Sequence, residues 1–482
     1  MLALALFSSG CAVGPNYHRP ASNIPAEWTA PSITGTQPGV APADDQWWKS
    51  FHDPELNSLI ARAVEANYDL KLSSARVEEA RAASGVARSA FYPQVNAGVS
   101  AERMRQTGIG LQPSSQPAGA TQAVAFPYEI NDYQGGFDAA WEIDVFGRLR
   151  RQAEAAKGDL RASADDRRYV LITIFGDVGR YYAELRGFQL RLDIANKNVA
   201  VAEDEVKLTR DLARAGQATE RDVAQAEAQL ESTRAQIPQL EASIEVSIHR
   251  LSVLTGQPPA ALEHELQTKA PLPVIPPDVP LGLPSDLLTR RPDIQSADAQ
   301  LAAATARIGQ AKAEYFPRFT LLGSAGRQAT QLHELTLGMG NFFAAGPSVS
   351  LPVFTGGRIR ANVAIQDARA QQSAAVYQRT VLNALEETEN SLVNYADEQS
   401  RRDHLEASVR ASQDAKGLAD AQYRAGLADF LTVLDSERTL FSNEDLLAQS
   451  QTEVVVNLIA LYKALGGGWS YDTPQLAAAN TR

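Results

Sequence analysis

The sequence lacks the residue patterns on which most enzymes depend. It has one cysteine in 482 residues, Cys11, which excludes an internal disulfide framework. Its six histidines form no HxxH or HExxH spacing, so no metal-ligand motif is present. No nucleophile elbow or phosphate-binding loop occurs either. We therefore predict that the protein is not an enzyme and carries no cofactor and no metal.

Two further features are missing. Lys and Arg number 45 against 57 Asp and Glu, a net charge of −12, which argues against nucleic acid as a partner. No run of 18 apolar residues occurs, so the sequence predicts no transmembrane helix. Apolar residues still make up 44% of the chain, enough for a core.

The single cysteine follows a short apolar run at the start of the chain. Met1–Phe7 is apolar, and Ser8-Ser9-Gly10 leads to Cys11, a pattern typical of a bacterial lipoprotein signal that is cleaved before a lipidated cysteine. We expect residues 1–11 to be a signal remnant, with Cys11 as the lipid anchor of an exported protein. An unused N-terminal thiol is the alternative. Residues 12–46, rich in Pro, Gly, Ser and Thr, should form an extended segment.

The rest of the chain is interpreted as two copies of one unit. The copies cover residues 47–256 and 284–468, a proline-rich linker covers 257–283, and a tail covers 469–482. Each copy should contain an amphipathic helix, two strands around an exposed loop, and a long helical hairpin. The fold class predicted is mainly α with a small β part.

The first helices are expected at Pro54–Ala90 and Pro284–Glu314. The exposed loops are expected at Gln106–Gln134 and Gln328–Gly346, where Gly, Pro and Ser are frequent.

One strand stands out by its alternation. In Phe137–Phe146, apolar side chains alternate with a face that holds Asp138, Glu142 and Asp144. Only four strands of about ten residues are expected in the whole chain, a length that can cross an outer membrane. Four strands cannot close a barrel, so several copies would have to share one. An ordinary soluble sandwich is the alternative.

Long heptad patterns follow the strands. One helix is expected from Arg148 to Arg214, about 100 Å at 1.5 Å per residue, packed as a coiled coil. Pro238 should bend or break the helix that returns.

In the second copy, one stripe of the returning helix is polar. The stripe consists of Ser436, Asn443, Ser450 and Asn457. We interpret it as a face toward water inside a tube. The alternative is a register shift, since Leu434, Phe441 and Val455 offer a neighbouring apolar stripe.

Two related turns join the long helices. Gly216 and Gly426, 210 positions apart, each follow a long helical pattern and suit the left-handed position after a helix end. Thr219 and Asp429 follow as helix N-caps, Thr219 with Asp222 as a capping box. We predict that these turns are the working end of the molecule.

Several motifs together resemble the TolC-like outer-membrane factors, and in particular the NodT-type lipoprotein channels of tripartite RND efflux pumps. They are Cys-x-x-Gly-Pro-x-Tyr at Cys11–Tyr17, Trp48–Leu56, Arg290–Ile294, Gly309–Pro317, Tyr423–Leu427 and Leu431–Asp435. The resemblance covers nearly the whole chain. It implies an outer-membrane homotrimer in a Gram-negative bacterium, with one twelve-stranded barrel and a helical periplasmic tunnel.

The resemblance also implies partners and a gate. The turns at Gly216, Thr219, Gly426 and Asp429 would dock a periplasmic adaptor protein that links the channel to an inner-membrane RND transporter. Leu431 and Asp435 match residues that close the tunnel tip, and Tyr423 matches a tyrosine that helps hold the closed state. Ala428 and Thr432 depart from the family, some of whose members carry Arg and Asp there.

In the trimer that the resemblance implies, Asp138, Glu142 and Asp144 would line the barrel lumen and favour cations. Two alternatives to an efflux channel are the channel of a type I secretion system and a periplasmic coiled-coil scaffold without a pore.

Overall fold

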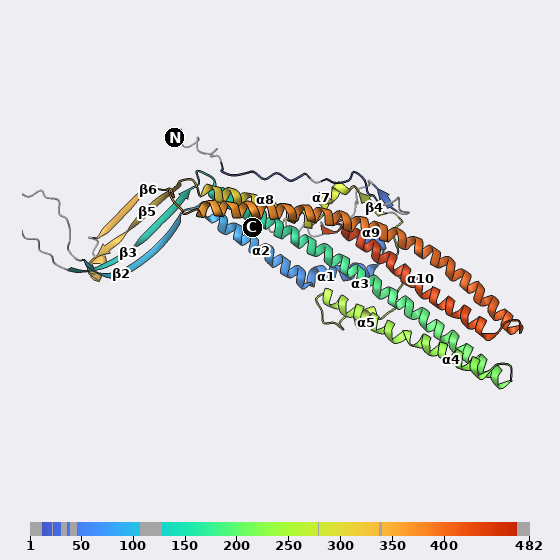
Figure 1. Ribbon diagram of the computed structural model, residues 1–482. Helices are drawn as coiled ribbons and strands as arrows, with labels where there is room; N and C mark the ends of the chain where they lie inside the picture. The colour runs from blue at the N-terminus through green and yellow to red at the C-terminus, as the bar shows by residue number, and fades with distance from the viewer. Residues whose placement is uncertain are drawn as a thin grey trace, which may run out of the picture. The chain divides into compact units, whose positions relative to one another are not determined.

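The computed structural model describes residues 12–21, 23–29, 36–38, 46–106, 128–277, 279–336 and 340–469 (Figure 1). These residues form two compact units. The sheet unit comprises Met1–Arg19, Glu79–Leu160 and Ala299–Ala374, and the helical unit comprises Pro20–Glu78, Arg161–Asp298 and Ala375–Arg482. Helix dominates, with a smaller antiparallel sheet, as predicted.

The sheet unit is built on four antiparallel strands in the order β2-β3-β5-β6 (Figure 1). Their bounds are Gln94–Gln106, Tyr128–Ile143, Arg318–Ala329 and Asn341–Ser350. The register aligns apolar positions across all four strands, because Phe137 of β3 lies opposite Ala97 and Ala325, and Ala325 lies opposite Phe343. One continuous apolar face results, and it is exposed in the single chain: Phe137 is 63% exposed and Phe343 is 88% exposed.

The two predicted loops are too long at their second ends. β3 begins at Tyr128 and β6 at Asn341, so the loop predictions to Gln134 and Gly346 are wrong there. Gly135 and Gly136 sit in the middle of β3, where pairing with the neighbouring strands on both sides holds residues of low strand propensity.

The prediction of only four strands is also wrong. The helical unit contains two short strands, β1 (Thr36–Pro38) and β4 (Val279–Gly282), which pair in parallel. Trp28 Nε1 donates a hydrogen bond of 3.1 Å to the carbonyl of Gly282 beside this pair. The extended N-terminal segment is thus bound to the proline-rich linker, which also carries the short helix α6 (Glu263–Leu266).

Two long helices follow the second and fourth strands of the sheet. α3 runs from Arg148 to Arg214, the predicted bounds, and α9 from Arg358 to Arg424, so both contain 67 residues. α10 (Phe430–Ala464) returns beside α9, while α4 (Glu220–Arg234) and α5 (Gln236–Leu254) return beside α3 (Figure 1). The predicted break near Pro238 lies at Ala235, so the proline occupies the first turn of α5, where its missing N–H has no helical partner to lose.

The shorter helices are interrupted where one helix each was predicted. α1 (Pro54–Ala66) and α2 (Tyr68–Ser89) are separated by the extended residue Asn67, whose Oδ1 accepts from the N–H groups of Asp69 and Leu70 and so caps α2. The second pattern divides into the 3-10 turn η3 (Pro284–Asp286), α7 (Leu287–Arg290) and α8 (Pro292–Ala313). Pro292 disfavours helical geometry at the residue before it, which ends α7.

The main core lies in the helical unit. The 3-10 turn η2 (Trp47–Phe51) inserts three buried aromatic rings into it, and Trp47 stacks on Tyr462 at 5.3 Å between ring centroids. Another 3-10 turn, η4, covers Leu332–Thr336. Among the residues that the structure describes, no helix combines the length and the apolar character that crossing a membrane requires.

Candidate functional site

The turn between α3 and α4 has the predicted geometry. Gly216 adopts a left-handed φ of 74°, and Gln217 N donates to the carbonyl of Leu212 at 2.8 Å, which closes the helix end. Thr219 and Asp222 form the capping box, since the Thr219 N–H donates to Asp222 Oδ2 at 2.9 Å and the Asp222 N–H donates to Thr219 Oγ1 at 3.3 Å. The hydrogen bond from the Thr219 backbone lowers the pKa of Asp222.

The turn between α9 and α10 repeats this arrangement. Gly426 has φ 71°, and Leu427 N donates to the carbonyl of Gln422 at 2.8 Å. Asp429 caps α10 by accepting from the backbone N–H and the hydroxyl of Thr432. Both glycines face open space, so their positive φ is what requires glycine.

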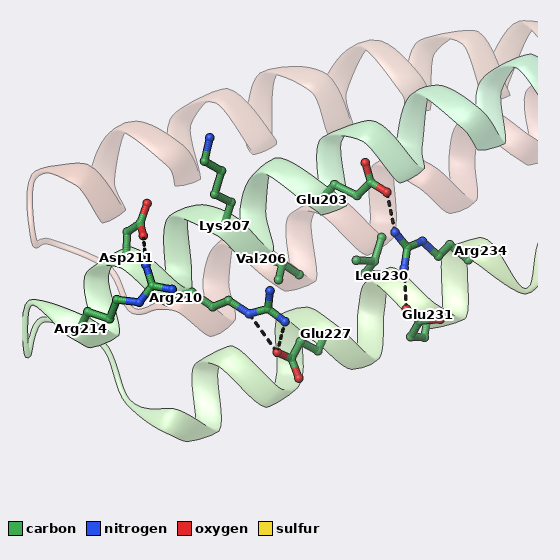
Figure 2. A pocket seen from close by; sticks show the side chains of 10 residues that line it. All are labelled: Glu203, Val206, Lys207, Arg210, Asp211, Arg214, Glu227, Leu230, Glu231 and Arg234. Carbon is green, nitrogen blue, oxygen red and sulfur yellow. Dashed lines mark hydrogen bonds and ion pairs between the residues drawn. The ribbon is translucent and has the colours of Figure 1, made fainter.

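The groove between α3 and α4 is lined mainly by charged residues (Figure 2). It has a volume of about 670 Å³ and is bridged by ion pairs from both directions: Arg210 of α3 lies 2.6 Å from Glu227, and Arg234 of α4 reaches Glu203. These pairs are exposed and hold the two helices together with little net charge.

The groove between α9 and α10 is different in character. It has a volume of about 960 Å³ and is lined mostly by Ala, Ser, Thr and other small or neutral side chains. The predicted gate residues Leu431 and Asp435 both line it, and Leu431 is 41% exposed. Asp429 also lines this groove, so the structure brings one turn residue and two gate residues together.

The third predicted gate residue, Tyr423, lies elsewhere. Its ring packs against Phe430 at 5.8 Å between centroids, and both rings belong to an apolar cluster that includes Val206 of α3 and Leu230 of α4. Burial raises the pKa of Tyr423. This cluster, which we call the seam cluster, joins the hairpin α3–α4 to the hairpin α9–α10.

Three residues of the polar stripe of α10 form hydrogen bonds with α9, whereas the fourth, Ser436, lines the groove between the two helices. Ser450 is fully buried and donates to Glu398, Asn443 donates to the hydroxyl of Ser412 at 2.8 Å, and Asn457 donates to the carbonyl of Asn394. The lumen interpretation is wrong for Ser450. Of the neighbouring apolar stripe offered as the alternative, Leu434 and Val455 are buried and Phe441 is half-buried.

The acidic residues near the sheet have different environments. Asp138 is exposed and accepts from Asn96 Nδ2 at 3.0 Å, and Glu142 pairs with Arg148 at 2.6 Å. Asp144 lies beyond the end of β3, and its carboxylate accepts from the backbone N–H groups of Leu149 and Arg150. The carboxylate of Asp144 therefore stabilises the positive N-terminus of α3.

The predicted lipid anchor, Cys11, lies outside the described residues. The segment after it is bound to the sheet unit by hydrogen bonds. Val13 N donates to Phe146 O at 3.1 Å, and the buried Arg151 donates to Val13 O at 3.2 Å and to Asn16 Oδ1 at 2.8 Å. A Cβ on Gly309 would lie 2.7 Å from Val13 O, so this close approach requires glycine. Gly309 belongs to the motif Gly309–Pro317, but no pattern in the sequence predicts that it contacts Val13.

No group of side chains suited to a metal ion was found within the described ranges.

A family profile described as outer membrane efflux protein matches residues 59–257 and 283–467. The chain is 33% identical to the pyoverdine export outer membrane protein OpmQ of Pseudomonas aeruginosa over 437 residues, which cover 90% of this chain and 89% of that protein. It is 32% identical to the solvent efflux pump outer membrane protein SrpC of Pseudomonas putida over 477 residues, 98% of each chain.

Solved structures agree. The outer-membrane channel OprN superposes with a TM-score of 0.88 and 36% identity, over 95% of this chain and all of that one. The open state of the Neisseria gonorrhoeae MtrE outer membrane channel gives a TM-score of 0.79 and 28% identity, over 95% and 99% of the two chains. With sequence and fold both matched over most of its length, the chain belongs to the outer membrane efflux protein family.

Proposed function

We propose that this chain is a passive outer-membrane exit channel of a tripartite efflux pump and works as a homotrimer. The main support for a trimer is the four-stranded sheet. Its apolar face is exposed, and within the described residues its outer strands, β2 and β6, each have one unpaired edge. Four strands cannot enclose a pore, whereas three copies supply the twelve strands of a closed barrel. Closure would pair the β2 and β6 edges and place the apolar face against lipid.

The two halves of the chain, 47–256 and 284–468, are proposed to be copies of one unit. The equal lengths of α3 and α9 and the matching turns at Gly216 and Gly426 support this proposal. Their helices would then form the wall of a periplasmic tunnel, with both turns at its tip.

The tip is proposed to be both gate and docking surface. Leu431 and Asp435 line the same groove between α9 and α10, and around a threefold axis three aspartates would repel one another while three leucines seal the gap. The turns that begin at Gly216 and Gly426 and are capped by Thr219 and Asp429 would dock the periplasmic adaptor, which connects the channel to an inner-membrane RND transporter.

In the trimeric barrel, Asp138 and Glu142 would line the lumen and favour cations. Glu142 is already paired with Arg148, so Asp138 would contribute most of the field. Lipidation of Cys11 would add an anchor, and the docked segment after it supports a fixed attachment point near the N-terminus of α3.

Two measurements test these proposals. Light scattering of the detergent-solubilised chain should give a protein mass three times that of one chain, and a monomer would contradict the shared barrel. In planar bilayers, Asp435→Ala should raise single-channel conductance, because it removes charge and bulk from the narrowest ring. Asp414→Ala, at an exposed carboxylate on α9, is the matched control, and equal conductance of both variants would exclude a gating role for Asp435.

A further inference from the structure

One carboxyl group, that of Glu437, is buried in the seam between the two hairpins. Glu437 of α10 is only 1% exposed, and its Oε1 accepts no hydrogen bond from any described residue. A buried carboxylate oxygen without a hydrogen bond strongly disfavours the charged form of the group.

The groups that face Glu437 add to this effect. Glu205 of α3 and Asp420 of α9 are both acidic, and Lys416 of α9 is the one cation that acts on it. Lys416 is already committed, since its Nζ lies 2.7 Å from Asp420 and 3.9 Å from Glu205. Arg424 of α9 also acts on Glu205, so the shared cation Lys416 leaves Glu437 itself without an ion pair of its own among the described residues. One and two turns back along α10, Leu434 and Phe430 pack into the seam cluster, to which α4 contributes Ala226 and Leu230.

The first hairpin shows how the same positions can be satisfied. Residues 210 positions earlier than Asp420 and Glu437 are Arg210 and Glu227, which form an ion pair of 2.6 Å between α3 and α4. In the second hairpin this ion pair is replaced by two acids. The neutralised pair of one hairpin thus corresponds to two acids in the other, the buried Glu437 and the half-buried Asp420, at the place where the two hairpins meet.

Burial, and next the charge of Glu205, raise the pKa of Glu437 to about 7 in the packed seam. A glutamate exposed to water has its ordinary value of 4.5. At pH values between 4.5 and 7, Glu437 is protonated while the hairpins are packed and loses its proton when they separate. Packing is therefore favoured in acid, weakens as the pH rises from 4.5 to about 7, and changes little above that.

We propose that Glu437 is a proton-operated latch on the seam between hairpins α3–α4 and α9–α10. The carboxyl group is neutral while the hairpins are packed and ionises as α9–α10 moves away from α3–α4. The latch itself rests on the seam geometry, and only its effect on conduction rests on the proposed channel function. With the two pKa values above, the ratio of packed to separated hairpins falls roughly 20-fold per chain between pH 5.5 and 7.5.

The test measures the distance between the two turns directly. Spin labels are placed at the exposed residues Gln217 and Leu427 of the full chain, in a Cys11→Ser background, and the labelled chain is co-expressed with an excess of unlabelled chain. Pulsed dipolar spectroscopy at pH 5.5 and 7.5 should show a separated population that grows at the higher pH. Conductance in planar bilayers over the same pH range is the second readout.

Three variants isolate the carboxyl group. Glu437→Gln imitates the protonated form and should stay packed at both pH values. Asp420→Arg restores the cation found in the first hairpin and should also abolish the pH response, by keeping Glu437 ionised and paired. Asp414→Asn removes an exposed carboxylate of α9 and should respond like the unmodified chain.

An unmodified chain without a pH-dependent distance, or a Glu437→Gln variant with the same pH response as the parent, would overturn the latch. If the distance responds as expected but the chain forms no conducting pore, the latch stands and the proposed channel function fails.

Discussion

Gly309→Ala should release the segment around Val13 from the rest of the sheet unit without damaging α8, the helix that contains Gly309. Alanine is favoured over glycine inside a helix by about 1 kcal/mol, so α8 itself should gain. The new methyl group, however, would lie 2.7 Å from Val13 O and 2.9 Å from two atoms of Arg151, one of them Nε. Neither the backbone nor the buried guanidinium can give way without breaking the hydrogen bonds between them.

The size of the effect follows from the hydrogen bonds that hold the segment in place. Three of them are 3.2 Å or shorter: Val13 N to Phe146 O, and Arg151 to Val13 O and to Asn16 Oδ1; a fourth, from Arg151 to Gly14 O, is longer at 3.4 Å and is left out of the sum. At a net 0.5–1.5 kcal/mol each, they stabilise the docked segment by about 2–4 kcal/mol. Breaking them should speed amide exchange in this segment by roughly 30- to 700-fold, at about 1.4 kcal/mol per factor of ten.

Hydrogen exchange read by mass spectrometry on the peptide that contains Val13 measures this change. Gly85→Ala is the matched control, because Gly85 also lies inside a helix of the sheet unit but a Cβ there meets nothing within 4 Å. Unchanged exchange of this peptide in Gly309→Ala, or equal acceleration in Gly85→Ala, would show that the close contact at Gly309 does not hold the segment.

Three more substitutions probe other parts of the chain, each followed by thermal unfolding in detergent. Gly426→Ala should destabilise by about 1–2 kcal/mol because alanine is strained at φ 71°, whereas Gly417→Ala, inside α9 and in open space, should be neutral or stabilising; equal effects would contradict the turn geometry. Arg291→Lys should cost about 2–3 kcal/mol, since lysine cannot keep the forked contacts to Asp293 together with the bond to the Ala464 carbonyl, and a shift below about 1 kcal/mol would show that charge alone suffices. Asn67→Ala should cost about 2–4 kcal/mol by removing the cap of α2 and leaving the Leu254 carbonyl unpaired, and an unchanged midpoint would show that water replaces the amide.

Long periodic segments are predictable because their packing is decided within the segment. The bounds of α3, Arg148 and Arg214, follow from a heptad pattern that ends in a glycine suited to a positive φ, and both features are local. The same holds for the turns and their caps at Thr219 and Asp429.

The features that escape prediction depend on partners far away in the chain. The sequence predicts a loop for the first half of β3 because its glycines signal no strand, and the neighbouring strands β2 and β5 supply the missing stability. Glu227 and Glu437 occupy matching positions in similar stretches, yet the side chain of Glu227 is 45% exposed whereas Glu437 is buried. Their difference arises from which helix lies opposite, and no local pattern contains that information.

The pairing of β3 with β5 also sets an order of events during folding. β2 and β3 are close in sequence and can form a hairpin early, but the partner of Ile143 is Phe319, roughly 180 residues later in the chain. At a synthesis rate of about 5–20 residues per second, that partner emerges about 10–40 s after β3. A β2–β3 hairpin formed before that partner is available would present an unpaired edge beside an apolar face, a combination prone to aggregation. The sheet is therefore completed late, by contacts of high sequence separation, and the nascent chain needs protection until its second half exists.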